Sequence, residues 1–89
     1  MKIATLEKIH ELLKEEVRTR NNALELTRKA YNKRQDDLEE IAAAADDMKD
    51  ESVTAAKRAV ETSKALYDEE WRQSRDADAA LRDFEDQDF

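Results

Sequence analysis

Glu7 and His10 are the first residues of the chain whose types and spacing suggest chemistry. On a helix, a Glu-x-x-His spacing places a carboxylate and an imidazole on one face, as in di-iron helical bundles. Such a site also needs inward carboxylates from facing helices, and the sequence offers no obvious partner at this level. We therefore interpret His10 as a polar residue between two helices and Glu7 as solvent-facing. A metal-binding bundle is the third of our hypotheses.

The acidic segment 83–89 is the second such group, because it ends in Phe89. An acidic peptide with a terminal aromatic residue and a free carboxylate can dock in a basic, apolar pocket. The segment resembles the acidic, phenylalanine-ending tail with which bacterial single-stranded-DNA-binding proteins recruit partners, although it lacks that tail's proline. The structural alternative is that Phe84 packs beneath the first helix. The residues of a partner-binding tail would be Phe84, Asp86, Asp88 and Phe89.

The composition excludes most catalytic and ligand-binding classes. The 89 residues include no Gly, Pro or Cys and a single His. Glycine-dependent phosphate and dinucleotide loops, disulfide frameworks and cysteine nucleophiles are therefore excluded, and we predict no enzyme activity and no cofactor. The net charge of −7 disfavours nucleic acid as a partner. No apolar run is long enough to cross a membrane, and we expect a cytoplasmic protein.

Apolar residues recur at heptad spacing through the first half of the chain, which predicts one long helix. With Ile3 as an a position, the a and d positions of the heptad keep one phase as far as Met48. We predict that this helix spans about residues 3–47. Its g positions widen the stripe to the broad apolar face of a bundle helix. They include Ile9, Ala23, Ala30 and Ala44.

A second heptad stripe runs from Val53 to Phe84, but it does not keep the phase of the first. Asp50 and Ser52 lie between the two stripes, and both residue types favour turns and helix N-caps over helix interiors. The sequence therefore predicts three further segments. They are a turn at about 47–52, a second helix over about 52–85 and a frayed acidic tail at 86–89.

The distribution of charge favours an antiparallel hairpin. Residues 14–34 carry a net charge of +4 and residues 68–88 carry −6. Folding the chain back at about residue 50 lays these two blocks side by side. Exposed ion pairs contribute little stability, so the blocks act on orientation and register.

Folding at residue 50 also predicts which residues meet between the helices. Phe84 would lie beside Val17 and Ser74 beside Thr27. Tyr67 would lie beside Arg34, which could stack on Tyr67 or Trp71 and bond to Glu70. The predicted seam consists of Leu24, Tyr31, Arg34, Leu38, Ile41, Val60, Tyr67, Glu70, Trp71, Leu81 and Phe84.

Two helices alone supply a small core, so we expect self-association, most simply a dimer that forms a four-helix bundle. In the predicted register the second helix leaves the first three turns of the first helix uncovered, and these turns are the most apolar in the chain. Two alternatives are a three-helix bundle broken at Asn21–Asn22 and one continuous helix in a long coiled coil. The unbroken phase from Val17 to Leu24 disfavours the first, and the later phase slip disfavours the second. The predicted oligomer interface consists of Ile3, Leu6, Ile9, Leu13 and Val17.

The two ends of the chain, MKIATLEKIHELL and LRDFEDQDF, together resemble those of small coiled-coil proteins encoded in bacteriophage and prophage genomes. The resemblance implies a role in a phage particle, in its assembly or in its interaction with the host, and a virion-associated location. It transfers no residue function to this chain. We therefore predict an all-α antiparallel two-helix coiled-coil hairpin that acts as a structural or adaptor protein. Its partners would be itself and an unidentified protein, and docking through the acidic tail is the alternative function.

Overall fold

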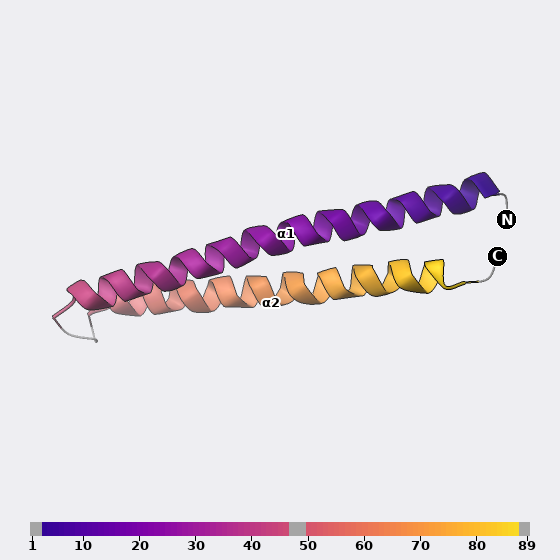
Figure 1. Cartoon of the computed structure of the whole chain (residues 1–89). Coiled ribbons are helices and arrows are strands. Elements are labelled where there is room, and N and C mark those ends of the chain that lie inside the picture. Colours follow the sequence, from indigo (N-terminus) through magenta and orange to yellow (C-terminus); the bar gives the residue numbers. More distant parts are fainter. Residues whose placement is uncertain (1–2, 47–49, 88–89) are drawn as a thin grey trace.

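The computed structural model describes residues 3–46 and 50–87. The heptad position Met48, residues 47–49 of the predicted turn, and the tail residues Asp88 and Phe89 lie outside the described residues. Over the described part of the chain there are two helices and no strand: α1 spans Ile3–Ala44 and α2 spans Glu51–Glu85. The helices lie side by side and antiparallel in a rod of 68 × 14 × 14 Å (Figure 1). The prediction of an all-α helical hairpin is confirmed.

α1 ends three residues earlier than predicted. Its last hydrogen bond beyond Ala44 runs from the Ala45 backbone N–H to the Ile41 carbonyl oxygen, at 3.0 Å. Asp46 follows immediately, and an acidic side chain is unfavourable beside the negative end of the helix dipole. Aspartate also competes for backbone hydrogen bonds, so the run of alanines ends where the first aspartate begins.

α2 begins at a well-defined N-cap. The Asp50 side chain accepts hydrogen bonds from the Ser52 backbone N–H at 2.8 Å and from the Ser52 hydroxyl at 2.7 Å. These two bonds, the backbone bond first, hold the pKa of Asp50 below its usual value. Glu51 lies in the first turn, where the helix dipole favours a negative charge. Of the two predicted caps, Asp50 and Ser52, the structure uses Asp50, and the helix starts one residue earlier than predicted.

The register between the helices differs from the predicted one by about one heptad. The Phe84 ring stacks on His10, with the ring centroids 5.7 Å apart, instead of lying beside Val17. Ser74 bonds to Asn21 instead of lying beside Thr27. The cause is the length of α1: because α1 ends at Ala44, three residues earlier than predicted, the second helix is shifted along the first. A shift of one heptad keeps every a and d position on the seam, so the predicted phase remains compatible with the observed packing.

The core lies at the turn end of the hairpin. Val53 is fully buried, with 0% of its surface exposed, and Ala56 one turn later is also buried. Among the described residues these are the buried apolar side chains, and Ser74 is the buried polar one. Each helix covers only one side of the other, so the other seam residues remain partly exposed.

The charge blocks do not meet as ion pairs. Among the described residues, all ion pairs but one join side chains three or four positions apart on the same helix. Arg20, for example, bonds to Glu16 at 2.9 Å. The exception is the pair between His10 and Glu85. Neighbours one turn away lie within easy reach of a long side chain, so the basic residues of α1 are neutralised locally.

Candidate functional site

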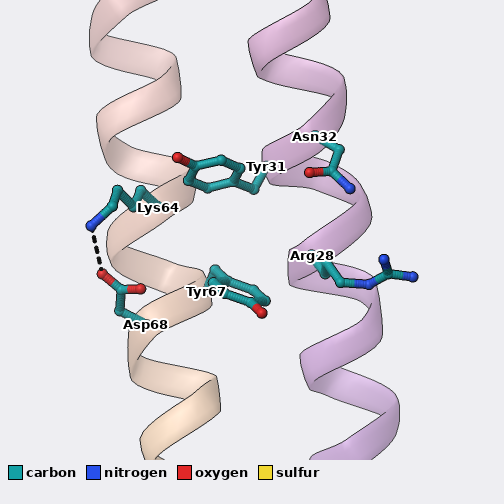
Figure 2. A pocket seen from close by; sticks show the side chains of 6 residues that line it. All are labelled: Arg28, Tyr31, Asn32, Lys64, Tyr67 and Asp68. Atoms are coloured by element: carbon teal, nitrogen blue, oxygen red, sulfur yellow. Dashed lines mark hydrogen bonds and ion pairs between the residues drawn. The ribbon is translucent and has the colours of Figure 1, made fainter.

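A groove of about 380 Å³ opens on one side of the hairpin at mid-length (Figure 2). Tyr31 of α1 and Tyr67 of α2 form its floor, with ring centroids 6.1 Å apart and ring planes tilted by 53°. Both rings lie between the helices in Figure 2. The groove is further lined by Arg28, Asn32, Lys64 and Asp68.

The two cations of this groove are paired with carboxylates on their own helices. Lys64 Nζ lies 3.2 Å from Asp68 Oδ2. Arg28 binds Glu25 in a bidentate manner, with Nε 3.0 Å from Oε2 and Nη2 bonded to Oε1. This hydrogen bonding raises the pKa of Arg28 and lowers the pKa of Glu25. The groove therefore presents an aromatic floor with locally balanced charge, which gives it little selectivity for an anionic or a cationic ligand.

A cross-helix contact closes the hairpin at the end away from the turn. His10 Nε2 lies 2.9 Å from Glu85 Oε2, and the imidazole ring stacks on Phe84 at an interplanar angle of 23°. The sequence had offered no carboxylate opposite His10, because the predicted register placed the end of α2 one heptad away. The one-heptad shift brings Glu85 to this level.

Two further polar groups lie in the seam. The Ser74 hydroxyl donates a hydrogen bond of 2.6 Å to Asn21 Oδ1. Glu70 Oε2 is buried and has no hydrogen-bond partner among the described residues. The sequence analysis did not identify Asn21 as a seam contact. Its heptad position, directly after the d residue Arg20, places it at the edge of the seam and could have indicated this contact. The middle of the seam is therefore polar, as its composition predicted.

The predicted cluster of Arg34 with Tyr67, Trp71 and Glu70 does not form. Arg34 is exposed and bonds to Asp37 of its own helix at 3.4 Å. Trp71 lies outside the seam with 46% of its surface exposed, and the Arg75 guanidinium lies over its ring, 4.8 Å from the centroid. Both predictions depended on the wrong register. Trp71 also follows the d position Glu70 directly, which turns its side chain toward the edge of the helix pair.

The other predicted seam residues are partly buried between the helices. They are Leu24, Tyr31, Leu38, Ile41, Val60, Tyr67, Glu70, Leu81 and Phe84.

The uncovered apolar segment at the start of α1 is shorter than predicted. Because Glu85 reaches His10, Leu13 and Val17 lie within the span of α2 and are partly buried. Ile3, Leu6 and Ile9 precede this level, and Ile3 is exposed. The argument from an uncovered apolar overhang therefore does not apply to Leu13 and Val17.

The metal and tail hypotheses gain no support from the geometry. Glu7 is exposed, His10 is engaged with Glu85, and over the described ranges no cluster of three His, Asp or Glu side chains could hold a metal ion. Phe84 packs on His10 and Asp86 is exposed after the end of α2, where its backbone N–H bonds to the Arg82 carbonyl oxygen at 2.9 Å.

The fold and its contacts define the class of protein: an antiparallel helical hairpin whose seam is polar in the middle. Comparisons of the chain with protein-family models, with curated proteins and with solved structures found no match. Neither helix, over the residues that the structure describes, is long and apolar enough to cross a membrane.

Proposed function

We propose that this protein is a non-enzymatic structural or adaptor protein that acts by helix packing, and that it self-associates, most simply as a dimer of two hairpins in a four-helix bundle. The observation that carries the proposal is the small core: among the described residues, only Val53 and Ala56 are buried apolar side chains. A chain with so little buried apolar surface gains most of its stability by packing against another chain.

The exposed surface area of the hairpin supports this proposal quantitatively. The hairpin exposes 6992 Å², whereas a compact monomer of its mass exposes about 5,400 Å². The difference is about 1,600 Å² per chain, and a standard interface buries about 800 Å² on each partner. Each hairpin thus has enough excess surface for a stable interface with a second copy.

The side chains capable of chemistry are engaged in structural contacts, which supports a non-catalytic role. His10 bonds to Glu85 and stacks on Phe84, and Asp50 caps α2. The resemblance of the chain ends to phage coiled-coil proteins suggests the assembly of a phage particle as the setting for this role.

Sedimentation equilibrium of the purified protein over a range of concentrations tests the proposal. We expect a mass of at least two chains at micromolar concentration, and a melting temperature that rises with protein concentration because association stabilises the fold. A single-chain mass at high micromolar concentration, together with a concentration-independent melting temperature, would contradict the proposal.

A further inference from the structure

α1 carries a second row of apolar side chains beside the seam. The c and g positions of its heptads hold Ile9, Leu12, Ala23, Leu26 and Ala30. Leu12 and Leu26 do not face α2, since 61% and 68% of their surfaces are exposed. A helix with two adjacent apolar rows is typical of a bundle in which each helix contacts two neighbours.

α2 carries a shorter apolar row at the same heptad positions, nearer the turn. It consists of Ala55, Ala59, Thr62 and Leu66, and Leu66 is 58% exposed. The four are separated by steps of four, three and four residues, so they lie on one face of the helix. Small residues between the larger ones allow a facing helix to approach closely.

The two rows lie on the same side of the hairpin. Two antiparallel helices are related by a two-fold axis that passes between them, so equivalent heptad positions fall on the same side. The tyrosine groove bears this out, because its walls come from the e and b positions of both helices: Arg28, Asn32, Lys64 and Asp68 (Figure 2). The c and g rows must therefore share the opposite side.

We propose that this opposite side, which we call the c/g face, is where a second copy of the chain packs. The inference rests on the self-association proposed above and names its surface. The c/g face holds three of the large apolar side chains that are exposed among the described residues: Leu12, Leu26 and Leu66. The apolar part of the α1 row lies toward the open end of the hairpin and that of the α2 row toward the turn, and the two meet near Ala30 and Leu66. An isologous interface presents the same patch from both copies, and the excess area of about 1,600 Å² per chain exceeds what such an interface needs on each partner.

The charge of the c/g face is partly balanced within each copy. Its acidic residues are Glu16, Asp37 and Glu40 on α1 and Glu69, Asp76 and Asp83 on α2. Glu16 is paired with Arg20 at 2.9 Å, Asp37 with Arg34 at 3.4 Å, and Glu69 with Arg72. Because these three carboxylates have a cation on their own helix, they repel a second copy less than unpaired carboxylates would.

Single glutamate substitutions test the face. Leu26→Glu and Leu66→Glu each place a charge at an exposed position, so the hairpin itself should persist. We expect both variants to sediment as one chain at concentrations where the wild type is a dimer, with the dissociation constant raised at least about tenfold, as expected for a charge buried in an apolar interface. Ala43→Glu is the matched control, since Ala43 is exposed on the outer face of α1, and it should remain dimeric. Circular dichroism at dilution checks helicity.

Cross-linking gives a second test that does not require a charged substitution. The chain has no cysteine, so Ala30→Cys on the c/g face and Ala65→Cys on the exposed outer face of α2 each carry one thiol. Ala30 and Ala65 lie at about the same level of the hairpin, so the two variants differ in face and not in position along the rod. We expect a short bismaleimide to give covalent dimers with Ala30→Cys and far fewer with Ala65→Cys.

The outcomes separate the two proposals. If the wild type is a dimer but Leu26→Glu and Leu66→Glu remain dimeric, and Ala65→Cys cross-links better than Ala30→Cys, the c/g face is wrong and self-association stands. If the wild type is a monomer at high micromolar concentration, self-association fails, and the c/g face as a self-association surface fails with it.

Discussion

Ser74 on α2 and Asn21 on α1 are joined by a hydrogen bond of 2.6 Å, although they are separated by most of the length of the chain. Ser74 is buried and Asn21 is exposed. The bond therefore fixes the register at a point where the seam has few apolar contacts to do so. A hydroxyl and an amide in this arrangement stabilise one register over a slipped one, because slippage would leave the buried hydroxyl without its acceptor.

Replacing Ser74 by alanine should lower the free energy of unfolding by about 0.5–1.5 kcal/mol, the usual net contribution of such a bond. Asn21→Ala should cost a similar amount, and the double variant should cost less than the sum, because both changes remove the same bond. Urea denaturation of the four proteins at one protein concentration measures this coupling. Strict additivity of the two single changes would show that the bond does not contribute.

Replacing Glu70 by leucine should stabilise the hairpin, by about 1–2 kcal/mol. Its Oε2 atom is buried without a hydrogen-bond partner among the described residues, and a buried polar atom without a partner costs about this much. The matched control is Glu15→Leu on the exposed outer face of α1, where the carboxylate is paired with Arg18 and no gain is expected. Chemical denaturation of both variants provides the comparison, and a loss of stability in Glu70→Leu would refute the interpretation.

Replacing His10 by alanine should loosen the open end of the hairpin without unfolding the turn end. The change removes both the bond to Glu85 and the stack on Phe84. Hydrogen exchange should become faster in the last two turns of α2, with little change around Val53. Lys8→Ala, two residues earlier at an exposed position of α1, serves as the control. Equal protection from hydrogen exchange in the last turns of α2, in the wild type and in His10→Ala, would show that this contact does not hold the open end together.

Asp50 makes stability depend on pH in the acidic range. Its pKa is lowered in the folded state by hydrogen bonds from Ser52, so its contribution is present above the ordinary aspartate pKa and is lost as the pH falls through the lowered value. Asp50→Ala should lower the melting temperature by several degrees at neutral pH, because the N-cap is lost, and the difference should shrink in acid. Asp50→Asn keeps an acceptor without the charge and should retain much of the stability, with less dependence on pH.

The sequence predicted the heptad phase but not the register, and the reason lies in the turn. The spacing from Ile3 onward fixes which side chains face the seam, and a slip of one heptad leaves that set unchanged. What decides among registers is where α1 stops, and residues 45–50 contain neither Gly nor Pro to mark the point. The N-cap at Asp50 was predictable because aspartate followed two residues later by serine has a local mechanism.

The site residues show the same difference between heptad phase, which the sequence predicts, and register, which it does not. Tyr31, Tyr67 and Phe84 were predicted as seam residues because their heptad positions suffice for that. Their partners were predicted wrongly, because a partner depends on register: Arg34 bonds to Asp37, and Phe84 meets His10. The g positions widen the apolar stripe in the sequence, but the sequence analysis did not single out the c positions Leu12 and Leu26, and their exposed fractions show that α2 does not cover them.

The tightly packed layer at Val53 lies at the opposite end of the rod from the contact between His10 and Glu85, where both helices have their free ends. Tension applied between those ends would load one pair of facing side chains at a time. The helices would then peel apart from His10 toward Val53, at a lower force than a shear geometry requires.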